Sequence, residues 1–406
     1  RVYFGAWAVQ PRVVGVFGAL NLMFLSACVA AALSMYFVAR RFGVKREGAL
    51  IAGLLYGVSN FILNRNVHHY FYIFYFTAPF NILVSTWLSS RKGIPFRSKR
   101  FSVAAITTIL SAWTATYYVF FAAQLYVLGT IAAVFRRGKN AEYKSIAALA
   151  CIFVLAVSLM HLDSVAYVLK HGPNSMSIGR AATDGEYFAL KPLNLFIPPQ
   201  VHKWPFMRTI SQVAMRQTMI NGEFPTSYAG LAGALGLIGL LFAFVRSIAQ
   251  QRVSRVTGWG AMAAWLLVAH SVGGLNSAMG LLGMHLFRST NRVSIFVIAL
   301  GLLFFGWAVG QMLSIIPNTF RVALTAGVGL FFAIEQMYAQ RPLSEVAEHR
   351  RLAESDRRLV QQMEDELDDG AMVFQLPAMH FPEAPAFRGV DGYELFRPTF
   401  YANTLR

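Results

Sequence analysis

The sequence predicts an all-α polytopic membrane protein with about ten transmembrane helices, followed by the start of an extracytoplasmic α/β domain. First, 56% of its residues are hydrophobic and only 14% are charged, which is far more apolar than a soluble protein. Second, apolar segments long enough to cross ~30 Å of hydrocarbon recur through the first 340 residues. Third, every second connection between these segments is rich in arginine and lysine.

The basic connections predict the direction of each span. Their clusters begin at Arg40, Arg91, Arg136 and Arg246. Short loops that carry lysine and arginine stay on the cytoplasmic side during insertion. The other connections therefore face outward, and the helices form hairpins that are joined on a basic cytoplasmic face.

The predicted spans follow from this alternation and make up a transmembrane domain over residues 1–340. In chain order they are residues 13–39, 48–63, 70–89, 101–114, 117–135, 145–162, 228–245, 257–271, 292–313 and 323–338. Residues 163–227 form a long polar loop on the extracytoplasmic side. Both ends of the sequence are predicted to lie outside. An outward start and a first residue that is not Met indicate an internal fragment with at least one missing upstream helix.

Residues 341–406 differ in composition, because 12 of the 19 acidic residues lie after residue 340. Residues 343–366 have the pattern of an amphipathic helix. Residues 371–376 have the pattern of a strand, and the prolines that follow predict an irregular path. We expect the truncated start of a soluble extracytoplasmic α/β domain.

Charge and cysteine content exclude several classes of protein. The net charge of +17 comes mainly from the predicted cytoplasmic loops, where anionic head groups attract it. Membrane lipids are therefore the expected partners, and no nucleic acid is predicted. Cys28 and Cys151 fall inside predicted spans, so neither a disulfide framework nor a zinc site is expected.

Motifs of soluble enzymes are absent, including phosphate-binding, zinc-protease and nucleophile-elbow patterns. Any activity must come from side chains on the outer face. The acidic residues predicted there, before the C-terminal domain, are Asp163, Asp184, Glu186 and Glu223.

The outer loop combines Asp184 and Glu186 with Lys191 and, further on, His202. Cations at a lipid boundary can hold a phosphate while a carboxylate takes a proton from an acceptor hydroxyl. The pattern therefore fits a lipid-phosphate substrate. The alternative is that Glu186 and Lys191 form a structural ion pair that orders the loop.

A second group of polar residues lies at the outer ends of predicted spans. Arg288, Asn291 and Arg292 precede an inward helix on the side where positive charge is less usual, which indicates anion binding. The alternative is that these arginines reach lipid head groups. His69 is a candidate for capping or substrate contact, or for simple placement at the interface.

Several segments are familiar in combination. They are residues 64–69, 186–191, 195–198, 202–203, 223, 287–294, 375–377 and 381–383. Together they resemble bacterial polytopic proteins of the GT-C glycosyltransferase type, closest to the YfhO-like and sugar-translocase-like branch. The resemblance covers most of the chain. Ala189 and Lys203 depart from it, since glycine and arginine are usual there.

The resemblance implies a GT-C-like fold and a protein of the bacterial cytoplasmic membrane. It implies transfer of a sugar or related group from a polyprenyl-phosphate donor to an extracytoplasmic cell-envelope acceptor. The catalytic acid of such proteins usually lies in an upstream loop, so here it is unknown, with Glu186 and Asp184 as candidates. The residues expected to bind substrate are His69, Lys191, His202, Arg288, Asn291 and Arg292. No cofactor is evident; a divalent metal is compatible with this chemistry, although no carboxylate pair has ligand spacing.

Two other classes stay open. A lipid-linked sugar flippase or transporter would favour internal repeats and charged residues within the spans. The spans carry few such residues, and Glu335 lies near an outer end. A non-catalytic envelope assembly factor could share the fold without the chemistry.

Overall fold

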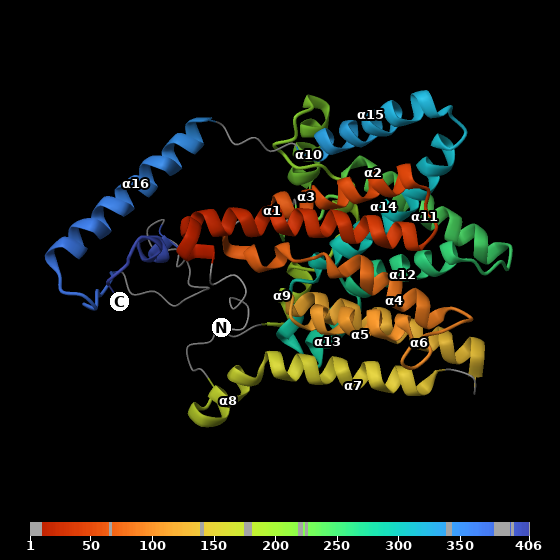
Figure 1. Ribbon diagram of the computed structural model, residues 1–406, viewed down its shortest axis with the longest axis horizontal. Coiled ribbons are helices and arrows are strands. Elements are labelled where there is room, and N and C mark those ends of the chain that lie inside the picture. The colour runs from red at the N-terminus through yellow and green to blue at the C-terminus, as the bar shows by residue number, and fades with distance from the viewer. Residues whose placement is uncertain are drawn as a thin grey trace.

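The protein is a bundle of helices (Figure 1). The computed structural model describes residues 10–64, 67–138, 142–173, 181–217, 222–223, 226–337, 343–376, 390 and 394–405. Within these ranges all extended regular structure is helical, and β-type pairing is limited to isolated bridges, at Leu190 with Ser271 and at Val390. The all-α prediction for the membrane domain is confirmed.

Each of the ten predicted spans contains a helix. The helices are α1 (Gln10–Arg41), α2 (Arg46–Gly57) with α3 (Asn60–Leu63), α4 (Thr77–Ser89), α5 (Lys99–Ala112), α6 (Thr116–Arg137), α7 (Tyr143–Met160), α11 (Gly230–Ala249), α12 (Arg255–His270), α14 (Ser294–Leu313) and α15 (Asn318–Gln336).

Not all of these helices can be assigned as membrane crossings. Among the described residues, five helices are both long and apolar enough to cross a bilayer. They are Gly18–Arg41, Thr116–Arg137, Tyr143–Met160, Gly230–Ala249 and Thr290–Leu313. The chain is therefore a helical membrane protein, and the full count of ten spans stays a prediction.

The predicted span 70–89 is divided into two helices. It begins as the 3₁₀ helix η2 (Val67–Ile73), and α4 starts only at Thr77. Pro79 explains the break, because a proline inside a continuous helix clashes with the carbonyl four residues earlier, here that of Tyr75. In the first turn of α4 the missing N–H costs little. The break leaves η2 at the end of the bundle.

Helix α14 forms the centre of the bundle and is buried over most of its length. It packs against α11 and α2. A side chain at Gly301 would place its Cβ 2.6 Å from the carbonyl oxygen of Gly233, so the two backbones touch. In contrast, α7 lies at the edge and buries only Ser145, Leu149 and Ala156.

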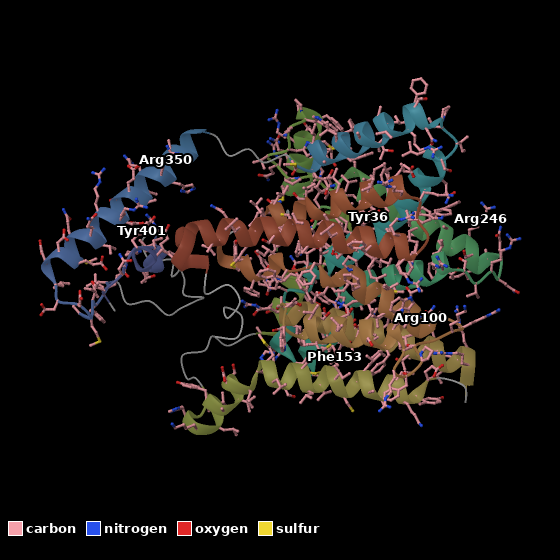
Figure 2. All side chains as sticks on the ribbon, viewed as in Figure 1. Tyr36, Arg100, Phe153, Arg246, Arg350 and Tyr401 are labelled. Atoms are coloured by element: carbon pink, nitrogen blue, oxygen red, sulfur yellow. The ribbon has the colours of Figure 1, made fainter. Side chains whose placement is uncertain are left out.

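The basic connections gather at one end of the bundle, which we term the basic end. Arg255 donates to the carbonyl of Phe42, and Arg137 Nη2 donates to the carbonyl of Leu88 at 2.9 Å. Figure 2 labels Arg100 and Arg246 at this end. The hairpin arrangement predicted from the charges is thereby present in the structure.

The described parts of the predicted outer loop are largely helical. They contain α8 (Leu162–His171), α9 (Ala182–Tyr187), the 3₁₀ helix η4 (Pro192–Leu195) and α10 (Pro205–Gln217). The connection before α14 contains α13 (Leu275–Leu281), η5 (His285–Phe287) and η6 (Thr290–Val293). Helix α9 packs against α13 and η5.

The C-terminal part differs from its prediction. Helix α16 (Leu343–Glu366) forms as expected, but residues 371–376 have no regular structure. The predicted strand is therefore wrong for these residues, and no α/β domain is found in the described part of the chain. A strand needs a partner backbone, whereas the residues that pack on α16 form a 3₁₀ turn, η8 (Pro398–Phe400).

Candidate functional site

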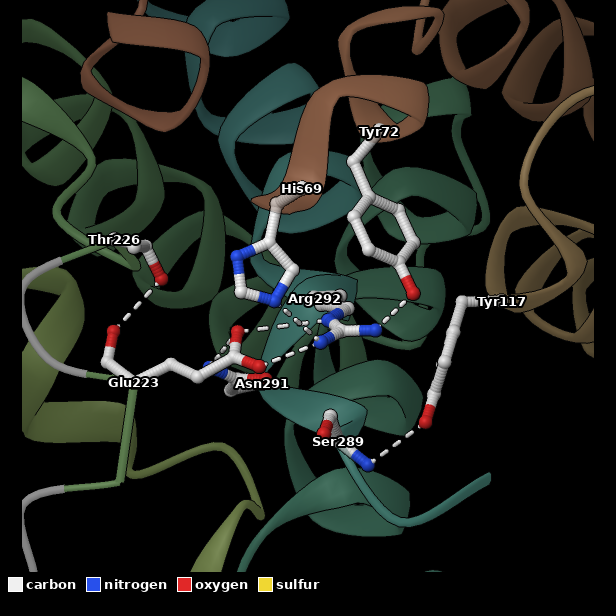
Figure 3. Close-up of polar contacts among 8 residues, drawn as sticks. All are labelled: His69, Tyr72, Tyr117, Glu223, Thr226, Ser289, Asn291 and Arg292. Carbon is white, nitrogen blue, oxygen red and sulfur yellow. Dashed lines mark hydrogen bonds and ion pairs between the residues drawn. The ribbon is translucent and has the colours of Figure 1, made fainter. Parts of the chain in front are cut away.

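A cluster of polar side chains lies where the chain enters α14, at the end of the bundle opposite the basic end. Figure 3 shows that it joins η2, α6, Glu223 with Thr226, and the segment before α14. We term His69, Tyr72, Tyr117, Glu223, Asn291 and Arg292 the polar cluster.

Arg292 is the centre of the polar cluster. Its Nη2 lies 2.6 Å from Glu223 Oε1 and 3.4 Å from His69 Nε2. Its Nε lies 3.5 Å from Glu223 Oε2, and its Nη1 donates to the hydroxyl of Tyr72. All three guanidinium nitrogens thus have partners, and the Arg292 side chain is 8% exposed. A buried cation is costly unless it is paired and hydrogen-bonded.

Two aromatic rings lie next to the guanidinium. Arg292 Cζ lies 4.1 Å from the centre of the Tyr72 ring and 4.7 Å from that of Tyr117. The Tyr117 hydroxyl in turn accepts from the amide of Ser289 at 3.1 Å. This arrangement stabilises a charge through ring quadrupoles as well as through the ion pair.

Glu223 is the ion-pair partner of Arg292, and it was not among the site residues predicted from the sequence. Its side chain is 13% exposed, and its Oε2 accepts from Asn291 Nδ2 at 3.1 Å. Its backbone carbonyl accepts from the Thr226 hydroxyl at 2.8 Å. The available signal was that Glu223 is one of four acidic residues in the outer connections. Because it neutralises Arg292, the predicted role of Arg292 in binding a phosphate has no direct support from this geometry.

A second ion pair lies beside the polar cluster. Arg288 Nη1 is 3.4 Å from Asp184 Oδ2, and the two side chains are 21% and 29% exposed. Arg288 Cζ also lies 5.4 Å from the ring centre of Phe188. The carbonyl of Phe188 accepts from the amide of Asn291 at 3.1 Å, which connects α9 to the polar cluster. The pair is more accessible than Arg292 with Glu223.

Lys191 lies close to the end of α9 and to the segment that contains Glu223. Its Nζ donates to the carbonyl of Tyr187 at 3.0 Å. A Cβ on Gly222 would lie 3.2 Å from that Nζ, so Lys191 is next to the residue that precedes Glu223. Partial burial lowers the pKa of Lys191, because desolvation disfavours its charged form. The alternative pairing with Glu186 is not formed, since Glu186 is exposed and has no ion-pair partner among the described residues.

His202 belongs to a different cluster. Its Nε2 lies 3.4 Å from Glu335 Oε1, and both side chains are fully buried. Because the amide of Trp204 donates to His202 Nδ1 at 3.2 Å, Nε2 carries the proton and donates to Glu335. Glu335 also accepts from the Tyr228 hydroxyl at 2.5 Å and from the amide of Leu231 at 3.0 Å. These contacts indicate a structural role for His202, which holds the outer connection against α15 through Glu335.

The structure thus brings most of the predicted site residues together. Six of them lie in or beside the polar cluster, together with Glu223: His69, Asp184, Lys191, Arg288, Asn291 and Arg292. The ring centre of His69 is 5.9 Å from that of Tyr72. Within the described residues, no three His, Cys, Asp or Glu side chains gather as metal ligands.

Comparison with known proteins provides no relative. No family model, no curated protein and no solved structure matches the chain. The site must therefore be interpreted from its own geometry.

Proposed function

We propose that the protein is a membrane-embedded, glycosyltransferase-like enzyme that transfers a sugar or related group from a polyprenyl-phosphate donor. The acceptor would lie on the extracytoplasmic side of the bacterial cytoplasmic membrane. The observation that supports this proposal is the convergence of Asp184, Lys191 and Arg288 at the end of the bundle opposite the basic end.

The cations in this region suit the phosphate of the donor. Arg288 is the better candidate, because its partly exposed guanidinium can hold a phosphate in a bidentate manner. Lys191 would add a second positive charge nearby. Arg292 would instead act as a positioning residue, since Glu223 already neutralises it and holds it in place.

Asp184 is the acid best placed for the chemistry. Glu186 comes two residues later on α9, roughly 200° around the helix, so it does not share the face on which Asp184 meets Arg288. When a phosphate occupies Arg288, the Asp184 carboxylate is released from its ion pair. It can then accept a proton from an acceptor hydroxyl.

The proposed step balances without a further reactant. The acceptor oxygen bonds to the anomeric carbon from the side opposite the phosphate, and its proton passes to Asp184. The bond between the anomeric carbon and the phosphate oxygen breaks, and its electron pair leaves with the polyprenyl phosphate. The configuration at the anomeric carbon inverts.

A transfer assay tests this proposal directly. Membranes containing the full-length protein receive radiolabelled polyprenyl-phosphate hexoses, and label in the cell-envelope fraction is measured. We expect D184N and R288Q to lower the transfer rate by about 100-fold or more, within the usual range for general-base catalysis.

Two variants serve as controls for the assignment. Glu142 lies at the start of α7 near the basic end, so E142Q removes a carboxylate remote from the site and should leave transfer unchanged. E186Q should also retain transfer, because Glu186 points away from Arg288. The absence of transfer by wild-type protein with every donor would overturn the proposed function. Full transfer by D184N and R288Q would overturn the site.

A further inference from the structure

Helix α10 exposes two faces of different chemistry. Its third side is buried through Met207 and Ser211, which are 6% and 0% exposed. Successive residues on a helix are about 100° apart, so the residue before and the residue after each buried position flank the buried side on different faces. The face before it is apolar and consists of Phe206, Ile210 and Val213; the face after it is polar and consists of Arg208, Gln212 and Arg216.

The apolar face is open although its residues are large. Phe206, Ile210 and Val213 are 58%, 44% and 49% exposed. The surface continues onto α15, because the Trp204 ring stacks on Phe206 at 6.4 Å and lies 5.7 Å from the Phe331 ring. Phe331 is itself 52% exposed on the outward side of α15. The apolar surface of the bundle and that of α10 are therefore continuous.

The position of α10 is set by the residue just before it. Trp204 donates its amide to His202, which is bonded to the buried Glu335 near the end of α15. Figure 1 shows α10 beside that end of α15, running across the long axis of the bundle. A helix that crosses the end of membrane-spanning helices lies parallel to the membrane surface, with its apolar face towards the acyl chains.

The polar face carries two arginines without acidic partners. Arg208 and Arg216 are exposed, and neither forms an ion pair with a carboxylate in the described part of the chain. They are eight residues apart, which is roughly 12 Å along the helix. This separation is wider than one phosphate group, so each guanidinium would contact a different head group. Anionic lipid surfaces attract such residues.

We propose that α10 lies in the head-group region of the leaflet at the polar-cluster end. Its apolar face contacts acyl chains, and Arg208 and Arg216 bind the phosphates of two anionic phospholipids. This inference requires only that the bundle spans a bilayer, and it does not depend on the proposed transferase activity.

The depth of α10 can be measured with nitroxide labels in vesicles of phosphatidylcholine and phosphatidylglycerol. The full-length protein is first made cysteine-free through C28A and C151A, and I210C or Q212C is then introduced. We expect oxygen, which partitions into lipid, to reach the label at 210, and a water-soluble nickel chelate to reach the label at 212. Access of the nickel chelate to both positions would overturn the proposal. Shielding of position 210 from both reagents would also overturn it, because a protein would then cover the face.

The role of the arginines needs a matched charge control. R208Q combined with R216Q is compared with R350Q combined with R358Q on α16, where both arginines are exposed and equally spaced. Phosphatidylglycerol that remains bound after detergent extraction is counted by native mass spectrometry. Because one basic residue at an anionic surface strengthens association about fivefold, we expect the α10 variant to lose a lipid for each arginine removed. Equal retention by both double variants would overturn the proposal.

Discussion

Arg292 shows how a charged residue can lie at the mouth of a buried membrane helix. Removing a guanidinium from water is costly, and three kinds of contact offset that cost. Glu223 supplies the opposite charge, His69 and Tyr72 accept hydrogen bonds, and the rings of Tyr72 and Tyr117 lie within cation–π distance of the guanidinium. Because these partners come from three separate segments, Arg292 connects η2 and the outer connection to α14.

Breaking this pair on one side should destabilise the protein strongly. We expect R292M or E223Q alone to lower the unfolding free energy in mixed micelles by about 3–5 kcal/mol, because each leaves a buried, uncompensated charge. The double variant should lose clearly less than the sum of the two.

The more exposed pair of Arg288 with Asp184 provides the comparison. Its side chains are 21% and 29% exposed, so R288M and D184N should each cost at most about 1 kcal/mol. If the two pairs proved equally important for stability, burial would not be the reason for the strength of the Arg292 pair.

At the residue scale, the sequence predicted which side chains belong to the site better than it predicted which partners they contact. His69, Asn291 and Arg292 were predicted because polar and positive groups are unusual at the outer end of an inward span. Their common partner was not predicted, because Glu223 is 69 positions from Arg292 along the chain. No local spacing rule connects residues so far apart, and only the folded backbone brings them together.

At the scale of elements, the bundle is assembled through close helix crossings. In a bilayer the hydrophobic effect does not drive helices together, so packing of small residues has to do so. Helices α11 and α14 meet where Gly301 touches the backbone of Gly233. Gly233 therefore acts as a packing contact between α11 and α14.

A methyl group at this crossing should force the helices apart. In G301A the new Cβ would lie 2.6 Å from the Gly233 carbonyl oxygen and 3.2 Å from the amide of Leu237. We expect a loss of about 1–3 kcal/mol in unfolding free energy, as for other overpacked interiors. The matched change G327A on α15 meets no atom within 4 Å and should cause no loss. A neutral G301A would show that α11 and α14 can separate freely.

The packing of the C-terminal residues on α16 should depend on pH. The backbone amides of Thr404 and Asn403 donate to Glu364 and lower its pKa. A lowered carboxyl pKa means that the contact is complete above the unfolded value of about 4.3 and is lost as the pH falls through the folded pKa.

Amide hydrogen exchange measures this contact. After correction for intrinsic exchange rates, protection of Asn403 and Thr404 should decrease on acidification through that range. In E364Q, protection should be weak at every pH and should not titrate. A wild-type profile that stays flat on acidification would show that Glu364 does not hold these residues.

The breaks and ends of elements were only partly predictable. The apolar pattern predicted one span over residues 70–89, but Pro79 requires α4 to begin near it and leaves η2 separate. The strand expected at 371–376 is absent because a strand forms only beside another, and a short apolar alternation does not show whether a partner exists. Helix α10 was not predicted, since its apolar residues fall within a stretch that is polar on average.

At the scale of the whole molecule, charge divides the bundle into two ends. Arg137 and Arg255 lie at the basic end, where their guanidinium groups donate to carbonyls of neighbouring turns. The ion pairs of Arg288 and Arg292 lie at the opposite end. The sequence was sufficient to predict this division, because charge placement during insertion depends on short loops rather than on tertiary contacts.

The orientation of these ends decides which compartment the polar cluster faces. In a cysteine-free background, K92C introduces a thiol in the basic connection after α4, and L281C introduces one at the end of α13, where Leu281 is 82% exposed. We expect a membrane-impermeant maleimide to label L281C in intact cells and K92C only in inverted vesicles, because loops rich in lysine and arginine remain cytoplasmic. The parent without cysteines serves as the control for background labelling. The reverse pattern would place Asp184 and Arg288 in the cytoplasm and would remove an extracytoplasmic acceptor from the proposed reaction, while the helix packing described above would stand.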